Sequence, residues 1–314
     1  MNHRNKMASQ NLKKWLGFLH FNKIPKQIYI GLIGGVGDLV LAAPSIAALK
    51  KKYPEAKICF GVGGSIFYDT IANDPNIDTF DTPLFYWPPT KNIRKQLVRK
   101  RVEWEKKLRY DLVILLDNPT HDWWKEGKHL IDIYADRCGV TLERRRPLIY
   151  LNDDDEAQGE DILERAGIEK GGSFIVLAPE TRSSRDIKEW PHQNFVELVQ
   201  RIHENFSIKI ITFVSPNSNR KYPGTVTIKD APTIRSVAAV IKRAHLYLGL
   251  NNGLAHIAGA FEGKIICIHI GFPIEVGGVI SPHAVFTSEE PFCDPASIGV
   301  DMVFEEVKKA LYNV

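Results

Sequence analysis

Residues 34–38, Gly-Gly-Val-Gly-Asp, carry the first candidate chemistry in this 314-residue chain. Gly35, Val36 and Gly37 follow an apolar run and precede the carboxylate of Asp38. Glycines between a strand and a helix let the backbone approach a ligand closely. A carboxylate at that point either caps the helix or acts as a base on a bound substrate. The residues alone leave both interpretations of Asp38 open.

A second candidate segment, residues 179–191, follows another apolar run and is rich in hydroxyls and cations. Its possible phosphate ligands are Thr181, Arg182, Ser183, Ser184, Arg185 and Lys188. Hydroxyl, guanidinium and ammonium groups all donate hydrogen bonds to phosphate oxygens. The alternative is an ordinary charged surface loop. Its position directly after a strand favours anion binding.

The third segment, residues 248–260, combines polar residues with small ones. Its candidate ligand-binding residues are Asn251, Asn252, Gly253, Leu254 and His256. A helix that begins here would point backbone N–H groups at a phosphate. A buried histidine with a purely structural role is the alternative for His256. Its place in the first helical turn favours contact with a ligand.

The elements that must position these segments form two series of alternating strands and helices. The expected strands are residues 27–33, 57–61 and 112–116 in the first series and 174–178, 209–214, 246–249 and 264–270 in the second. Strands alternating with helices predict parallel sheets covered on both faces. We expect a lead with an amphipathic helix (1–26), a first domain (27–155), a linker (156–172), a second domain (173–290) and a tail with a helix (291–314).

Composition excludes several classes of protein. Apolar residues make up 44% and charged residues 25% of the chain, which excludes intrinsic disorder. No apolar run reaches the ~18 residues that span a bilayer. The four cysteines form no CxxC pair, which speaks against a zinc ribbon, and the net charge of +4 does not indicate nucleic-acid binding. With no secretory leader recognised, a cytoplasmic location is expected.

Three charged stretches have two interpretations each. Residues 12–19 and 91–109 are basic and helical in pattern. They are either ordinary packed or solvated helices, or surfaces for a membrane or an anionic acceptor. The acidic run 153–155 is interpreted as the first turn of a helix rather than as a metal site.

Taken together, the three candidate segments resemble glycosyltransferase family 9, the heptosyltransferases of lipopolysaccharide core synthesis. Gly37-Asp38 is followed by Pro44, six residues after the aspartate. Lys188-Glu189-Trp190-Pro191 matches the family's Lys-x-Trp-Pro, and residues 251–256 are similar to its Asp-x-Gly-x-x-His. The resemblance spans residues 28–310 in the family's order and spacing.

The resemblance implies a GT-B fold, in which two Rossmann-like α/β domains face each other across a cleft. It implies an inverting, metal-independent transfer with no cofactor besides a nucleotide-sugar donor, expected to be ADP-heptose. Asp38 would be the catalytic base beside the acceptor-side loop of residues 35–37. The donor-binding residues would be Thr181, Arg182, Ser183, Lys188, Ser215, Asn251, Asn252, Gly253, Leu254 and His256. The acceptor would be an anionic glycolipid or oligosaccharide, reached at the inner face of the inner membrane.

Two departures from the family pattern bear on the donor. Asn251 stands where the family usually has aspartate. The loop of residues 215–220 has no glutamate to bind the ribose, and the helix that usually follows is almost absent before Val226. Another nucleotide-sugar donor, a protein acceptor and a non-catalytic nucleotide-sugar-binding module are therefore the alternatives.

Overall fold

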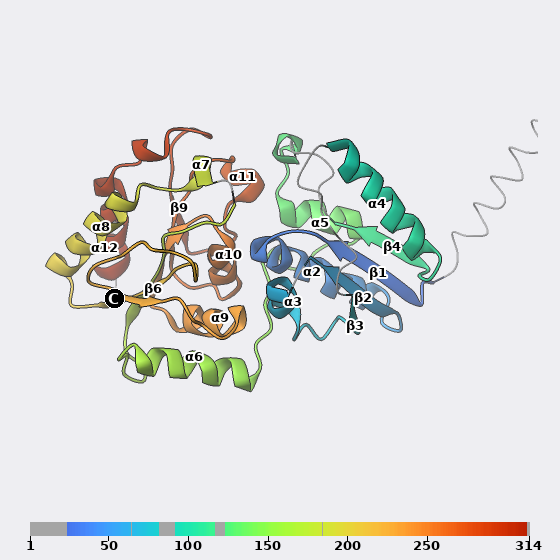
Figure 1. Cartoon of the computed structure of the whole chain (residues 1–314), viewed down its shortest axis with the longest axis horizontal. Coiled ribbons are helices and arrows are strands. Elements are labelled where there is room, and N and C mark those ends of the chain that lie inside the picture. The colour runs from blue at the N-terminus through green and yellow to red at the C-terminus, as the bar shows by residue number, and fades with distance from the viewer. Residues whose placement is uncertain (1–23, 64, 82–91, 117–122, 184, 313–314) are drawn as a thin grey trace, which may run out of the picture.

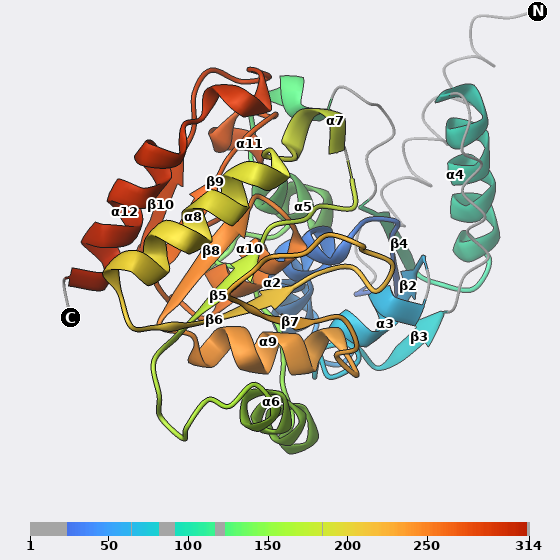
Figure 2. The same ribbon diagram turned by 60° about the vertical axis from the view of Figure 1, so that its left-hand side comes forward.

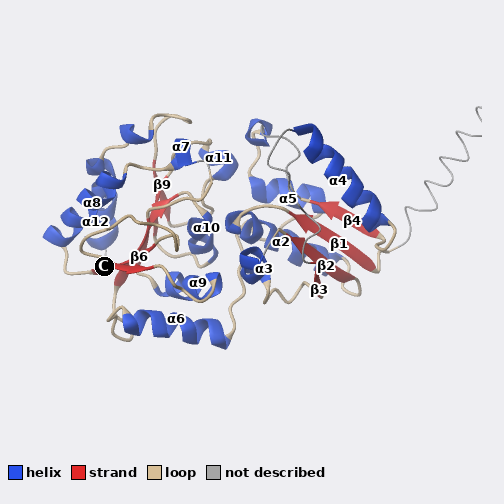
Figure 3. Ribbon diagram, in the orientation of Figure 1, coloured by secondary structure: helices blue, strands red, loops and turns tan. Residues whose placement is uncertain are grey.

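The computed structural model describes residues 24–63, 65–81, 92–116, 123–183 and 185–312, which form two α/β lobes (Figure 1). Each lobe contains one parallel sheet, and helices cover the sheets (Figure 3). This confirms the expected architecture of two parallel-sheet domains. The amphipathic stretch at residues 12–19 and the hydroxyl of Ser184 lie outside the described residues.

The first domain has a four-stranded sheet in the order β3-β2-β1-β4. Its strands are β1 (Gln27–Leu32), β2 (Lys57–Val62), β3 (Thr79–Asp81) and β4 (Leu112–Leu115). Its helices are α2 (Val36–Lys52), α3 (Ser65–Ile71), α4 (Asn92–Lys107) and α5 (Leu130–Cys138), with a short 3-10 turn η1 (Trp123–Glu126). The central strand β1 is buried from its second residue onward, as its continuous apolar sequence requires.

The second domain has a six-stranded sheet in the order β10-β9-β8-β5-β6-β7. Its strands are β5 (Phe174–Ala178), β6 (Lys209–Phe213), β7 (Val226–Ile228), β8 (Leu246–Leu250), β9 (Ile265–Ile268) and β10 (Ala284–Thr287). The helices are α6 (Asp153–Arg165), α7 (Arg185–Lys188), α8 (His192–Asn205), α9 (Ile234–Arg243), α10 (Gly253–Ala260), α11 (Ile274–Gly277) and α12 (Val300–Tyr312), with the 3-10 turn η2 (Pro295–Ser297). Read from β7, the strand order is that of the classic dinucleotide-binding sheet.

Strand order places all three candidate segments where ligands bind in such sheets. In doubly wound parallel sheets, the binding crevice lies at the carboxyl ends of the strands, where the strand order reverses. That point lies between β1 and β4 in the first sheet and between β5 and β8 in the second. Residues 34–38 follow β1, residues 179–188 follow β5 and residues 251–256 follow β8.

Helix α6 accounts for most of the segment that was expected to be a linker. It packs along α9, so closely that a Cβ built on Gly159 would lie 2.6 Å from the Cβ of Ala239. Ile162 is buried in the core of the second domain. The Asp155 N–H donates to the Asn152 side chain at 2.9 Å, which makes the acidic run the capped first turn of α6, as expected. The segment is therefore largely a helix of the second lobe.

The two domains meet along two pairs of helices (Figure 2). The N-terminus of α2 lies against that of α10, where a Cβ on Gly253 would lie 3.0 Å from the Cβ of Val36. Val40 of α2 is buried within the core of the second domain. Beside this contact, Arg235 of α9 forms a 2.8 Å salt bridge with Asp69 of α3.

Helix α4 is the basic helix expected near residues 91–109. Lys106 is buried, with its ammonium 4.6 Å from the centre of the Tyr29 ring and paired with Asp81. Two other cations form i,i+4 salt bridges with glutamates on the same helix. Trp104 and Leu108 are exposed. Across the described residues, no helix is both long and apolar enough to cross a membrane.

Candidate active site

Asp38 lies in the first turn of α2 and is held from two sides. Its Oδ2 accepts a hydrogen bond from the Gly35 N–H at 2.7 Å, and its Oδ1 accepts one from the Tyr134 hydroxyl at 2.8 Å. Each carboxylate oxygen keeps a further acceptor site. The residue therefore stabilises the start of the helix and also presents a half-buried carboxylate at the carboxyl end of β1.

Gly34 provides the space that the Asp38 side chain occupies. A Cβ built on Gly34 would lie 2.6 Å from the Cβ and 2.7 Å from the Oδ2 of Asp38. Contacts that short do not occur between real atoms, so any larger residue at position 34 would move the carboxylate. The first glycine of the segment is thus needed by the carboxylate itself.

Lys188 ends the short helix α7 of the second domain. Its ammonium lies 5.0 Å from the centre of the Phe272 ring. Burial lowers the pKa of the Lys188 ammonium, and the negative charge of Asp38 partly opposes that shift. The structure therefore brings the carboxylate of one domain and the ammonium of the other into electrostatic contact. Among the described residues, none forms a hydrogen bond or salt bridge with this ammonium.

His256 lies on α10 and faces the N-terminus of α2. A Cβ on Gly37 would lie 2.8 Å from its Cδ2, so the ring packs directly on the glycine backbone. Burial lowers the pKa of His256 to about 3, and nearby positive groups add to the effect. The ring is neutral near pH 7, and its buried Nδ1 has no hydrogen-bond partner within the described part of the chain.

Asn252 caps α10 and is fully engaged. Its Oδ1 accepts from the N–H groups of Leu254 and Ala255 at 2.9 and 3.1 Å. Its Nδ2 donates to the Glu180 carbonyl at 2.8 Å, which ties the loop after β5 to the start of α10. The side chain shapes the site rather than facing a ligand. Leu254 is partly buried against the core of the second domain.

Asn251 is buried and is attached to α11. Its Nδ2 donates to the Gly277 carbonyl at 2.9 Å, a bond that an aspartate could not make. Its Oδ1 has no partner among the described residues. The amide therefore holds the segment after β9 and leaves one acceptor free.

The hydroxyl-rich loop after β5 is divided between turn contacts and solvent. Thr181 is buried and its hydroxyl donates to the Ser183 carbonyl at 3.2 Å, while Arg185 donates to the Thr181 carbonyl at 3.0 Å. Arg182 and Ser183 are exposed at the rim. Thr181 thus shapes the loop that carries Lys188.

Glu180 is a candidate functional residue that the sequence motifs did not indicate. Its Oε2 accepts from the Ser215 N–H at 3.1 Å and its Oε1 from the Ser218 hydroxyl. An acid is thereby present at the loop after β6, although that loop contains none. A carboxylate at the end of the second strand of a dinucleotide-binding sheet binds the ribose diol. No sequence motif indicated this position, because it depends on a contact between loops 35 residues apart in the chain.

A cluster of aromatic rings joins the two domains. Trp124 of the first domain lies 5.0 Å from Phe292 and 6.4 Å from Phe272 of the second, measured between ring centres. Phe272 is also the ring beneath Lys188. No motif marked these residues, because isolated aromatic residues in loops carry no periodicity.

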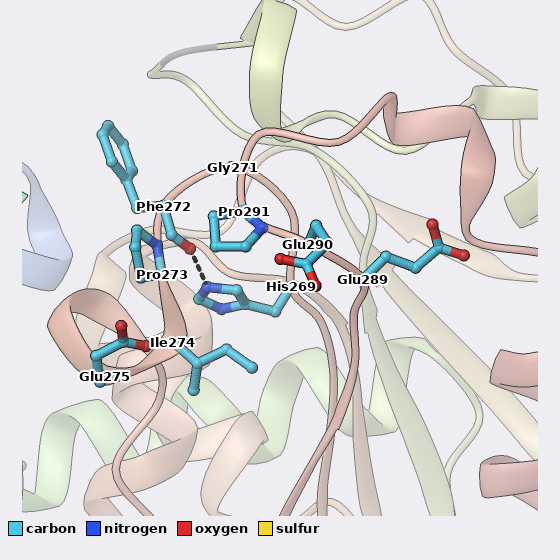
Figure 4. Close-up of a pocket in the computed structure, with 9 residues that line it drawn as sticks. All are labelled: His269, Gly271, Phe272, Pro273, Ile274, Glu275, Glu289, Glu290 and Pro291. Atoms are coloured by element: carbon cyan, nitrogen blue, oxygen red, sulfur yellow. Dashed lines mark hydrogen bonds between the residues drawn. The ribbon is translucent and has the colours of Figure 1, made fainter.

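A separate cavity of about 150 Å³ lies in the second domain between α11 and the loop after β10. Figure 4 shows its acidic side chains around His269, whose Nε2 donates to the Phe272 carbonyl at 2.7 Å. The Phe272 ring points away from the cavity. Burial lowers the pKa of His269 to about 4. Among the described residues, no group of three or more histidine, cysteine or acidic side chains could hold a metal ion.

The arrangement combines an oriented carboxylate, a partly buried cation and the N-terminus of an eight-residue helix. A carboxylate can accept the proton of an attacking hydroxyl, and a cation with helix N–H groups can stabilise a departing phosphate. The family model for "Glycosyltransferase family 9 (heptosyltransferase)" matches residues 95–271, more than half of the chain. The chain belongs to glycosyltransferase family 9. It is therefore a glycosyltransferase, as the resemblance implied.

Solved structures of similar proteins share the fold. A family 9 glycosyltransferase from Veillonella parvula has 16% sequence identity and a TM-score of 0.71, over 92% of this chain and 98% of that one. The E. coli ADP-heptose lipopolysaccharide heptosyltransferase II has 14% identity and a TM-score of 0.65, over 92% and 99%. The iron-containing dodecameric heptosyltransferase TibC of enterotoxigenic E. coli has 13% identity and a TM-score of 0.62, over 93% and 77%. No curated protein matched the chain.

Replacing Gly34 with alanine tests whether the space for Asp38 matters. We expect Gly34→Ala to displace the carboxylate and lower the transfer rate by about 10–100-fold, because misplacement of a catalytic group by about 1 Å costs that much. Steady-state kinetics measure the rate. Gly263→Ala is the control, since a Cβ there meets nothing within 4 Å. Equal rates in the two variants would contradict the assigned role of Gly34.

The free energy of unfolding should decrease as the pH is lowered, because His256 and His269 are buried in the neutral form. Their folded pKa values of about 3 and 4 lie below the usual 6.5, so the unfolded chain binds protons first. The free energy of unfolding is then highest above about pH 6.5 and falls below it, by at most about 1.4 kcal/mol per pH unit and histidine. Urea unfolding between pH 5 and 7 measures the slope.

The matched variants are His269→Gln and, at an exposed position, His283→Gln. We expect only the first to make the free energy of unfolding less dependent on pH. The same pH dependence in wild type and His269→Gln would show that burial of this ring does not contribute to it.

Proposed function

We propose that the protein transfers heptose from ADP-heptose to a lipopolysaccharide core acceptor, with inversion at the anomeric carbon. The observation that carries the proposal is the position of Asp38 and Lys188 on opposite domains, close enough for their charges to interact. One group serves the acceptor and the other serves the donor. The proposal extends the family's activity to a particular donor, acceptor and stereochemistry.

The donor is proposed to bind at the carboxyl ends of β5 and β8. Lys188 and the N–H groups of α10 would hold the diphosphate, and neutral His256 would contact it or the sugar. Gly253 lets the start of α10 lie directly against α2, since a Cβ there would be 3.0 Å from the Cβ of Val36. The loop residues Thr181, Arg182, Ser183 and Ser215 are proposed to border the same site.

The transfer itself requires one proton acceptor and one stabilised leaving group. The acceptor oxygen attacks the anomeric carbon from the side of the first domain, and its proton passes to Asp38. The bond from that carbon to the diphosphate oxygen breaks on the opposite side, which inverts the configuration. Lys188 and the helix N-terminus stabilise the charge on the departing diphosphate, so we propose that no metal ion is needed.

The donor assignment draws on the names of the similar proteins. One is an ADP-heptose lipopolysaccharide heptosyltransferase, and TibC was solved with ADP-D-β-D-heptose. Glu180 supplies the ribose-binding carboxylate that the 215–220 loop lacks. Asn251 remains a departure, and another nucleotide sugar, a protein acceptor or a non-catalytic binding module are the alternatives.

The proposed acceptor is anionic and attached to a lipid, so the enzyme is proposed to work at the cytoplasmic face of the inner membrane. Trp104 and Leu108, four residues apart, are exposed near the end of basic helix α4. An exposed tryptophan and leucine on a helix rich in lysine and arginine are typical of a membrane-surface helix. This face of the first domain is the proposed site of peripheral contact.

Removal of the Asp38 carboxylate tests the proposed reaction. We expect Asp38→Ala to lower heptose transfer to a deacylated core oligosaccharide by at least about 100-fold, because the acceptor loses its base. Binding of ADP-heptose, measured by thermal shift, should remain. Activity of the wild type is expected to survive EDTA. Transfer at the wild-type rate by Asp38→Ala would contradict the assignment.

A panel of ADP-, GDP- and UDP-sugars distinguishes the alternatives in the same assay. Stabilisation by another nucleotide sugar would replace the donor proposed here. Stabilisation by ADP-heptose with no transfer to core oligosaccharide or to protein would favour the non-catalytic binding module.

Replacement of Glu180 by glutamine tests its role in ribose binding. The amide keeps the size of the side chain and loses the charge that accepts from the ribose hydroxyls. We expect Glu180→Gln to weaken binding of ADP-heptose and of ADP alone by about 10-fold, since hydrogen bonds to charged groups contribute about 1.5–3 kcal/mol. Glu189→Gln, whose carboxylate pairs with Arg220, is the control. Unchanged ADP affinity in Glu180→Gln would exclude the role.

A further inference from the structure

The His129 side chain connects the two domains. Its Nδ1 accepts from the Ile131 N–H at 3.2 Å, which makes His129 the N-cap of α5. Its Nε2 lies 2.8 Å from the Gly278 carbonyl oxygen of the second domain. A carbonyl only accepts, so Nε2 carries the proton and the ring is neutral. Both ring nitrogens of this buried side chain are therefore engaged, one in each domain.

The segment that receives this bond, residues 277–280, is fixed in both domains. Asn251 holds the Gly277 carbonyl at 2.9 Å. Val279 is buried in the core of the second domain, while Ile280 packs against the core of the first. The bond from His129 to the Gly278 carbonyl therefore depends on how the two domains are placed relative to each other.

Helix α5 leads from this joint to the proposed base. Tyr134 lies five residues after His129 and is buried in the core of the first domain. Its hydroxyl donates to Asp38 Oδ1 at 2.8 Å. Helix α5 begins at the boundary between the two lobes (Figure 1), so the element that orients Asp38 is also the element that contacts the second domain.

We propose that His129 and Tyr134 are positioning residues that couple the arrangement of the domains to the orientation of Asp38. The cross-domain bond of His129 fixes α5, and Tyr134 on α5 fixes the carboxylate. The base is then correctly aimed only when the donor and acceptor domains are docked as they are here. The inference rests on the proposed function, in which Asp38 accepts the proton.

Two conservative variants remove the Tyr134–Asp38 and His129–Gly278 hydrogen bonds one at a time. Tyr134→Phe keeps the buried ring and removes the hydroxyl. His129→Asn keeps an oxygen that caps α5 but is too short to reach Gly278. Each variant is expected to lower kcat by about 10–100-fold, because the orientation of the Asp38 carboxylate changes. The KM for ADP-heptose should stay within about twofold, because the contacts to the donor do not change. Tyr29→Phe, which removes another buried hydroxyl of the same domain, is the control and should leave kcat unchanged.

The double variant tests whether the two residues act through one path. If His129 acts through Tyr134, His129→Asn adds less than about twofold to the loss caused by Tyr134→Phe. Losses that multiply would overturn the coupling. A rise of KM that matches the fall of kcat would assign both residues a merely structural role.

A second measurement needs no substrate. The Gly35 N–H is protected by its bond to Asp38 Oδ2, so amide hydrogen exchange in residues 33–38 reports the hold on the carboxylate. Exchange should be faster in both variants and unchanged in Tyr29→Phe. Unchanged exchange in Tyr134→Phe or His129→Asn would overturn the inference. Faster exchange with no transfer by the wild-type protein would instead contradict the proposed function.

Discussion

The contact between the N-termini of α2 and α10 determines the geometry of the whole site. It requires glycine on both sides, because a Cβ on Gly37 would collide with His256 and one on Gly253 would collide with Val36. The contact brings together two helix ends that carry partial positive charge. Helix α2 carries Asp38, while Lys188 ends α7 in the segment after β5, which Asn252 ties to the start of α10.

The junction of two helix N-termini favours binding of an anion, and it also limits how many positive side chains can be buried beside it. Lys188 is the fixed cation, and burial disfavours its charged form. His256 and His269 stay neutral because a second and third positive charge in the same buried region would be costly. The inner part of the site therefore has its positive charge on Lys188 and the two helix ends, while Arg182 is exposed. That distribution suits a diphosphate whose charge grows as the sugar departs.

The sequence predicted the long buried strands well, because a strand covered on both faces must be continuously apolar. The strands β3, β7 and β10 escaped prediction because they are three or four residues long and only partly buried. The expected linker proved to be mostly α6, whose acidic first turn obscured its buried face. For Asp38, capping and exposure to a substrate were posed as alternatives, and the geometry allows both at once.

Glu180 shows how a carboxylate from another loop can reach the place where the motif residue is missing. The carboxyl ends of β5 and β6 lie side by side in the sheet, so an acid after either strand reaches the same place in space. A sequence motif distinguishes an acid after β5 from an acid after β6, but a ribose bound at this edge of the sheet could contact either one. Asn251 is the opposite case. It keeps its place in the motif, yet its amide donates to the Gly277 carbonyl and so holds the end of α11. A residue outside a motif can therefore be placed where the motif residue is expected, and a residue within a motif can be used for a structural contact. The contacts in the folded chain show which case applies.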